Sequence, residues 1–225
     1  MLSLSVQVGA LALGVLASPL PAVAVLVTLL TKRAKPNSLV MLVSWIVGVV
    51  LALGISVMLA GRIHLPSAGV DLPFEGLFTA LLGIGVFIMG VHSRRGRFRS
   101  EDPQDPPAWV NSVDNLSPIG GAIVVFSNAT TSPKNLALAI SAGALLTKPG
   151  VPVVDSIVAA TVYIIIASLT LVGPVALYVF GGDKSTAILQ RWKDKVTENA
   201  AAVMEISLFG IGLAMTAKGL FNLLT

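Results

Sequence analysis

Long stretches with almost no charged residue dominate this sequence and restrict what it can fold into. Six of them are long enough to cross a bilayer: 1–31, 38–61, 72–91, 119–147, 151–182 and 199–224. A membrane span needs about 20 apolar residues. Only 12% of the 225 residues are charged, whereas a soluble domain carries about 25%. We therefore expect an all-α integral membrane protein with six transmembrane helices.

Several kinds of chemistry are excluded by residues that the chain lacks. There is no cysteine, which removes disulfides, thiolate metal sites and cysteine nucleophiles. His64 and His92 lie far apart at expected helix ends and make a poor metal site. The sequence has no H-E-x-x-H, G-x-S-x-G or P-loop motif. We therefore expect a protein that is not an enzyme, has no catalytic residue and needs no metal or cofactor.

The basic residues are divided unequally between the expected loops. Eleven of the fifteen lie in the segments 31–37, 93–118 and 182–199. Lys and Arg in short loops mark the cytoplasmic side of a membrane. This rule predicts a multi-pass protein of the inner (plasma) membrane with these three loops in the cytoplasm and both termini outside. The basic runs are expected to contact anionic lipid headgroups and no nucleic acid, because lipid is the nearer polyanion.

The polar segment between the third and fourth spans divides the chain into two halves. We expect a first three-helix repeat at 1–93, a cytoplasmic linker at 94–117 and a second three-helix repeat at 118–225. Because three is an odd number, two tandem halves insert with opposite orientation, which is the inverted-repeat plan of many secondary transporters. Within the linker, Pro107–Val110 is expected to open a short interfacial helix with Trp109 at headgroup depth.

A Ser-Pro pair lies near the middle of the first span of each half. Ser18-Pro19 is followed by Pro21, and Ser132-Pro133 is its counterpart. Proline cannot donate the helical hydrogen bond and it crowds the preceding turn. We expect helices one and four to break at these prolines, with the freed backbone groups facing protein or a water-filled cavity. The alternative is two unrelated packing kinks.

The segment around the second break places polar side chains in the middle of a span. A lysine at this depth costs at least about 2.5–3.5 kcal/mol, so Lys134 needs a partner, a cavity or a ligand. The half-helix that Pro133 opens has a positive N-terminal end, which favours an anion or a strongly polar headgroup. The alternative is a structural lysine that caps carbonyls or pairs with a carboxylate. The candidate substrate-binding residues are Lys134, Asn135, Asn128, Ser132, Thr131, Pro133, Ser18, Pro19 and Pro21.

Glu205 lies about five residues into the last span. It is a candidate for carrying a coupling proton. The alternative is a carboxylate that reaches the membrane interface or meets the cations of a loop.

Two patches of this sequence resemble a known family of membrane proteins. The proline breaks and Ser132-Pro133-Lys134-Asn135-Leu136 resemble the LysE superfamily of exporters, which often carries Asn-Pro-Lys at this position. Pro107-Ala108-Trp109, Asp114-Asn115-Leu116-Ser117-Pro118 and 132–139 are more closely similar to the GAP family of glycopeptidolipid-addressing and sulfolipid-1-addressing proteins. Ser132 departs from the usual Asn, which leaves the donor at that position open.

The resemblance implies a LysE-like fold in an actinobacterial inner membrane. It also implies that the protein exports or translocates an envelope lipid, such as a glycolipid or glycopeptidolipid, or its precursor. One alternative is a LysE-type exporter of small polar solutes such as amino acids. A second alternative is a non-transporting scaffold for a complex that synthesises or exports lipid. The expected partners are a lipid substrate, membrane lipids and lipid synthesis or export machinery, and a homo-oligomer is left open.

Overall fold

The computed structural model describes residues 2–31, 33–62, 74–98 and 117–224. The expected all-α class is confirmed, because the described residues form helices joined by short turns. The helices are α1 (Leu2–Leu16), α2 (Pro19–Leu29), α3 (Ala34–Arg62), α4 (Phe74–Phe98), α6 (Pro118–Thr131), α7 (Pro133–Leu146), α8 (Val153–Phe180), a 3₁₀ turn (Gly182–Lys184) and α9 (Ser185–Leu224).

Three of the described helices contain segments long and apolar enough to cross a bilayer: 34–60, 153–180 and 202–221. The α1–α2 pair, which is bent by 59°, adds a fourth crossing if it counts as one span. Apolar side chains such as Val43 and Ile157 are about 60% exposed on these helices, which suits contact with lipid. The chain is therefore a multi-pass membrane protein. The apolar parts of α4 and α6 are shorter, at 83–92 and 119–131, so six spans stay a prediction.

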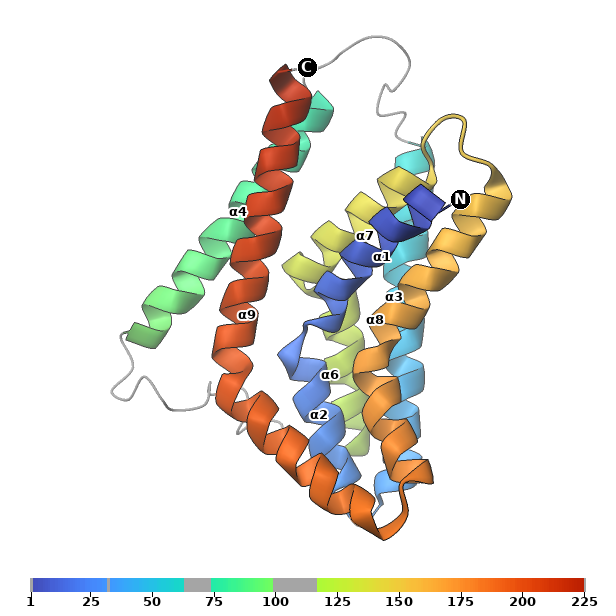
Figure 1. Ribbon diagram of the computed structural model, residues 1–225, viewed down its shortest axis with the longest axis vertical. Helices are drawn as coiled ribbons and strands as arrows, with labels where there is room; N and C mark the ends of the chain where they lie inside the picture. Colours follow the sequence, from blue (N-terminus) through green and yellow to red (C-terminus); the bar gives the residue numbers. More distant parts are fainter. Residues whose placement is uncertain (1, 32, 63–73, 99–116, 225) are drawn as a thin grey trace.

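Successive helices run in alternating directions (Figure 1). The pair α1–α2 descends in this view, α3 rises, α4 descends, the pair α6–α7 rises, α8 descends and α9 rises. The start of α1 and the end of α9 therefore lie toward the same end of the molecule. The turns between α2 and α3 and between α8 and α9 lie at the other end.

The main core is formed by α1, α2, α3, α6, α7 and α8. Along it, α1 packs against α8 and α6 packs against α3. Trp45 and Tyr163 are the largest fully buried side chains. The indole Nε1 of Trp45 donates to the carbonyl oxygen of Ala167 at 3.1 Å, which ties α3 to α8. These contacts link the two broken helix pairs to each other through α3 and α8.

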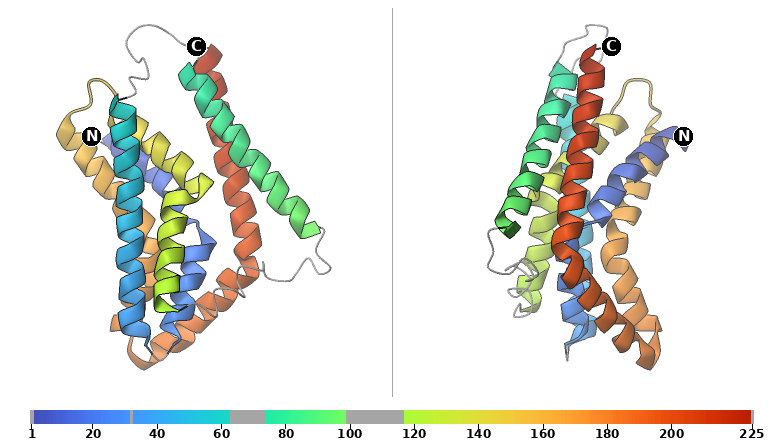
Figure 2. Two further views of the ribbon diagram at one scale, coloured as in Figure 1. Left: turned by 180° about the vertical axis from the view of Figure 1, so that it is seen from behind. Right: turned by 60° about the vertical axis from the view of Figure 1, so that its left-hand side comes forward.

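A second unit is formed by α4 and α9, which lie side by side in all views (Figure 2). Their backbones are in close contact, because a Cβ atom added at Gly212 would lie 2.6 Å from the backbone nitrogen of Phe87. A small hydrophobic cluster joins this pair to α7 through Ala137, which packs with Val86, Leu208 and Met215.

The prediction of a loop at 182–199 is wrong for most of that segment, because α9 already begins at Ser185. The helix forms because its apolar residues recur at helical spacing and find a surface to cover. Leu189 is fully buried while Arg191 and Lys195 are exposed, and α9 packs against α2. This first part of α9 crosses the lower end of the bundle in Figure 1. The expected interfacial helix at 107–110 lies outside the described residues.

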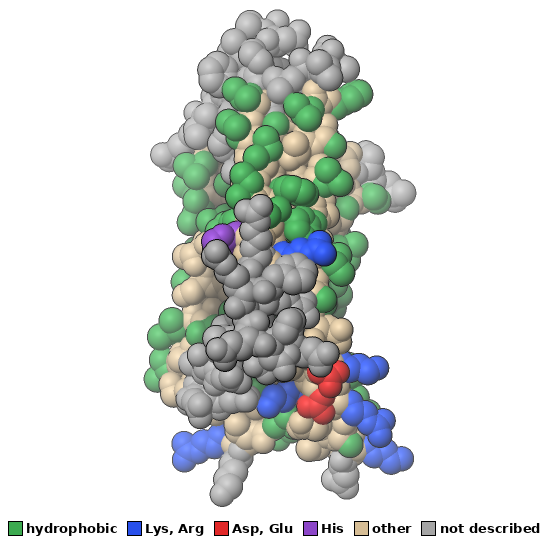
Figure 3. All heavy atoms as spheres, turned by 90° about the vertical axis from the view of Figure 1, so that its left-hand side faces the viewer, with side chains coloured by type: hydrophobic (Ala, Val, Ile, Leu, Met, Phe, Trp, Pro, Cys, Tyr) green, Lys and Arg blue, Asp and Glu red, His purple; other side chains and the backbone are tan. Residues whose placement is uncertain are grey.

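Basic side chains gather at the same lower end (Figure 3), below an upper region where hydrophobic side chains predominate. Exposed members of this group are Arg33, Lys35, Lys184, Arg191 and Lys195. The distribution agrees with the unequal division of basic residues along the sequence.

Candidate functional site

The two predicted helix breaks are confirmed. α1 ends at Leu16 and α2 begins at Pro19, while α6 ends at Thr131 and α7 begins at Pro133. Ser18 and Ser132 have extended backbones between the half-helices. Each proline takes the first helical position. A backbone N–H group at that position has no acceptor within the helix, so proline's lack of one costs no hydrogen bond.

The two breaks lie against each other in the folded chain. The hydroxyl of Ser18, at the first break, donates to Oδ1 of Asn135, next to the second break, at 3.4 Å. Both side chains are buried, with at most 4% of either exposed. Residues that are 117 positions apart in the sequence therefore share one polar site.

Lys134 crosses from the start of α7 to the end of α1. Its side chain is only 8% exposed, and Nζ donates to the carbonyl oxygens of Gly14 at 3.0 Å and Ala17 at 3.1 Å. The last carbonyls of a helix lack partners within the helix and carry its negative dipole end. A buried ammonium group is therefore stabilised here without a carboxylate, and none pairs with it in the described part of the chain. This arrangement matches the carbonyl-capping alternative for Lys134.

Other side chains satisfy the remaining ends of the broken helices. Thr170 donates to the carbonyl oxygen of Leu16 at 2.8 Å. The amide of Asn135 donates to the carbonyl oxygen of Asn128 at 2.9 Å and to its Oδ1 at 3.2 Å. Asn135 thus caps the end of α6, just as Lys134 caps the end of α1. The adjacent residues in the first turn of α7 stabilise both breaks.

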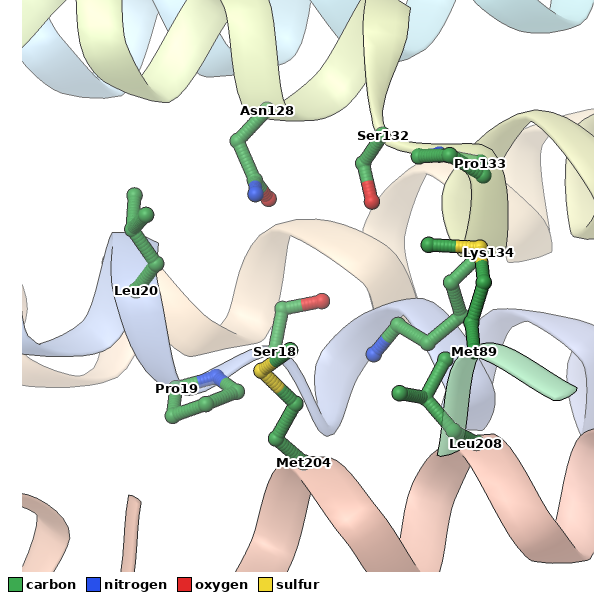
Figure 4. Close-up of a pocket in the computed structure, with 10 residues that line it drawn as sticks. All are labelled: Ser18, Pro19, Leu20, Met89, Asn128, Ser132, Pro133, Lys134, Met204 and Leu208. Atoms are coloured by element: carbon green, nitrogen blue, oxygen red, sulfur yellow. The ribbon is translucent and has the colours of Figure 1, made fainter. Parts of the chain in front are cut away.

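A cavity of about 270 Å³ lies beside the breaks (Figure 4). Ser18, Asn128, Ser132 and Lys134 point into the same space from its polar side. An ammonium group has three N–H donors, and two of those on Lys134 are used by the carbonyls. This wall also offers the amide of Asn128 and the hydroxyl of Ser132. The wall thus offers a few hydrogen-bond donors and one positive charge within a mostly apolar cavity, which suits a ligand group with several acceptor oxygens.

The opposite side of the cavity is apolar. It is lined by Leu20 of α2, Met89 of α4, and Met204 and Leu208 of α9. These four residues were not predicted as site residues, because an apolar residue in a membrane span gives no signal that separates a cavity wall from a lipid-facing surface. The cavity is therefore amphipathic, with its polar residues at the two breaks and most of its apolar residues on α4 and α9.

Some of the predicted site residues line the cavity and others do not. Six line the cavity: Ser18, Pro19, Asn128, Ser132, Pro133 and Lys134. Asn135 lies behind this wall and holds Ser18 and Asn128 through its amide. Pro21 is buried within α2, and the exposed Thr131 donates to the carbonyl oxygen of Ser127. Glu205 is half-buried on α9, adjacent in sequence to Met204, and does not line the cavity.

The fold and the site define a class: a multi-pass, all-helical membrane protein with an amphipathic cavity where two broken helices meet. The family model of Sap, the sulfolipid-1-addressing protein, matches residues 8–221. The chain therefore belongs to this family, which confirms the resemblance seen in the sequence. Searches of curated proteins and of solved structures found no match.

Proposed function

We propose that this protein is an inner-membrane transporter that translocates an envelope lipid, or its precursor, toward the outside of the cell. The headgroup binds at the helix breaks while the acyl chains stay in the bilayer. The amphipathic cavity carries this proposal, since it joins a small, positively charged polar wall to a larger surface of Met and Leu side chains. The family's name, which refers to the addressing of a sulfolipid, supports a lipid as the ligand.

Binding of the headgroup follows from the donors that the polar wall leaves available. Charge-assisted hydrogen bonds are roughly twice as strong as neutral ones, and the third N–H of Lys134 offers one. The Ser132 side chain makes no cap hydrogen bond at the start of α7. Its hydroxyl and the Asn128 amide add neutral donors beside the ammonium group. An oxyanion or a sugar hydroxyl cluster would satisfy all three.

An inverted repeat of residues 1–93 and 118–225, with six spans and a LysE-like arrangement, belongs to the same proposal. Three features support it. The matched Ser-Pro breaks lie together, α1–α8 and α3–α6 are corresponding packed pairs, and the last helices of the two halves, α4 and α9, pack on each other. In such folds the site lies between the repeats, and their relative motion exposes it to either side in turn. Glu205 is our candidate for a coupling group.

The apolar wall favours a lipid over the alternative of a small polar solute such as an amino acid. A solute exporter would be expected to enclose its substrate in polar groups on all sides. A scaffold without a ligand would be expected to have a dry, filled interior, whereas this cavity adjoins a buried lysine.

Replacing Lys134 tests the proposal. In proteoliposomes containing a fluorescent anionic lipid, Lys134→Ala should abolish translocation, because the charged donor of the headgroup site is lost. The matched control Lys148→Ala changes an exposed lysine in the turn after α7 and should translocate at the wild-type rate. Thermal unfolding of each variant is measured on the same preparation.

Two further variants keep this test decisive if Lys134→Ala misfolds. Ser132→Ala removes a hydroxyl that makes no cap hydrogen bond and should slow translocation severalfold without changing stability. Lys134→Arg keeps the charge but widens the donor group and should translocate poorly. A folded Lys134→Ala protein that moves lipid at the wild-type rate would exclude the proposed site.

A further inference from the structure

The apolar wall of the cavity comes from the α4–α9 pair, apart from Leu20. Met89 is 39% exposed and Met204 is 36% exposed, while Leu208 is 3% exposed and packs into the small cluster with Ala137. In Figure 4, Met204 and Leu208 lie across the cavity from Asn128 and Ser132, and the end of the Met89 side chain lies beside Pro133 and Lys134. The two methionines therefore present accessible apolar surface next to a charged donor wall.

Methionine suits a surface that must adapt to aliphatic chains. It is unbranched, has three rotatable side-chain bonds and carries a polarisable sulfur atom, so it fills irregular gaps. Leu208 fixes the base of this wall through its contacts in the small cluster. Such a surface can follow a chain whose position changes, whereas a β-branched wall would be stiffer.

The size of the cavity indicates which part of a lipid it holds. Pockets that enclose a drug-sized ligand have volumes of about 300–1,000 Å³, and this cavity has about 270 Å³. A headgroup with the beginning of its chains fits, and the rest of each chain must leave the cavity. Met89 and Met204 are themselves partly exposed, so a chain that passes them leaves the cavity at the surface of the molecule.

We infer that Met89, Met204 and Leu208 form an acyl-chain subsite, in which α4 and α9 hold the first part of the lipid chains while the broken helices hold the headgroup. The inference rests on the proposed function, because it assumes that the group bound beside Lys134 is the headgroup of the lipid whose chains lie against these three residues. The chemical class of the ligand is an oxyanion headgroup joined directly to aliphatic chains.

Binding measurements with two probes test this subsite. Short-chain phosphatidic acid carries both parts of the ligand, and glycerol phosphate carries the head alone. The variant Met89→Gln/Met204→Gln keeps the side-chain shape but makes the wall polar. It should bind phosphatidic acid about tenfold more weakly than the wild type and glycerol phosphate equally well. The control Met58→Gln, at a 59% exposed position on α3, should change neither affinity.

Three results would overturn the inference: unchanged affinity of the double variant for phosphatidic acid, an equal loss for both probes, or equal wild-type affinity for both probes. The same pair of measurements with a sulfated lipid and inorganic sulfate shows whether the polar side of the cavity binds sulfate or phosphate more tightly. Translocation is measured separately. A wild-type protein that binds phosphatidic acid through this wall but moves no lipid would contradict the proposed function and leave the subsite standing.

A contact measurement covers the case in which the Gln variants misfold. Because the chain has no cysteine, a fluorophore can be attached to a single introduced cysteine. In nanodiscs with a trace of phosphatidic acid spin-labelled near the head end of its chain, a label at Met204→Cys should be quenched more than one at Met58→Cys. Excess unlabelled phosphatidic acid should remove the difference. Equal quenching at both positions would contradict the subsite.

Discussion

At the scale of single residues, Lys134 and Asn135 explain how a membrane protein can contain two broken helices side by side. In a bilayer no water replaces the lost backbone hydrogen bonds. Lys134 donates to the end of α1 and Asn135 donates to the end of α6. The structural and ligand-binding interpretations of Lys134 are therefore compatible, since capping uses two of its three donors.

Asn135 provides a test of this capping that does not depend on transport. Asn135→Leu should lower the free energy of unfolding by about 1–3 kcal/mol, because the partly buried carbonyl of Asn128 loses its side-chain donor and the buried Ser18 hydroxyl loses its acceptor. Asn199→Leu is the control, since Asn199 is exposed and donates to the carbonyl of Lys195 on its own helix. Chemical unfolding in detergent micelles measures both. Equal effects of the two substitutions would show that Asn135 is not a necessary cap.

At the scale of elements, α4 and α9 behave as a pair. Their close backbone approach depends on glycine, because a Cβ atom at Gly83 would overlap the backbone of Thr216. Small residues that let helices approach are common in membrane interfaces. The pair supplies the apolar wall of the cavity, so its position relative to α7 sets the width of the site.

Two glycines on the same helix test this packing. Gly83→Ala should destabilise the protein by about 1–3 kcal/mol, because overpacking forces the helices apart. Gly85→Ala, two positions along α4, has no neighbouring atom within 4 Å of the added Cβ and should be neutral or stabilising by up to about 1 kcal/mol. Thermal unfolding compares the variants. A Gly83→Ala protein as stable as Gly85→Ala would rule out tight packing at this position.

At the scale of the whole molecule, the alternating helices place the turn between α7 and α8 and the first part of α9 at opposite ends (Figure 1). The basic residues at the end formed by α9 predict that this end faces the cytoplasm. The predicted orientation, with both termini outside, follows from these two observations together.

Cysteine labelling in intact cells tests the orientation. A membrane-impermeant maleimide should modify Lys148→Cys, in the turn after α7, without permeabilisation. Lys195→Cys on α9 and Ser100→Cys in the expected linker should react only after the membrane is opened. The chain's lack of cysteine gives a clean background. Ready labelling of Lys195→Cys in intact cells would reverse the orientation.

The sequence by itself determined the class of the protein, the places where two helices break and the polar residues beside the second break. These features depend on local physics: apolar length decides membrane insertion, and proline interrupts its own helix wherever it falls. The family followed from two short patches, at 107–118 and 132–139, and the second of them contains the second break. The prediction of a loop at 182–199 was wrong because this segment forms the amphipathic start of α9, which is stabilised by packing against α2.

Only the tertiary structure decided which groups satisfy the breaks and what closes the site. Lys134 and Gly14 are 120 positions apart, and no local pattern indicates that one donates to the other. Nor does the sequence distinguish Met89 and Met204, which line the cavity, from the lipid-facing Met58. The physical reason is that lipid and a protein interior are both apolar, so the same residue types suit both. Their roles are fixed only when α4 and α9 pack beside the broken helices.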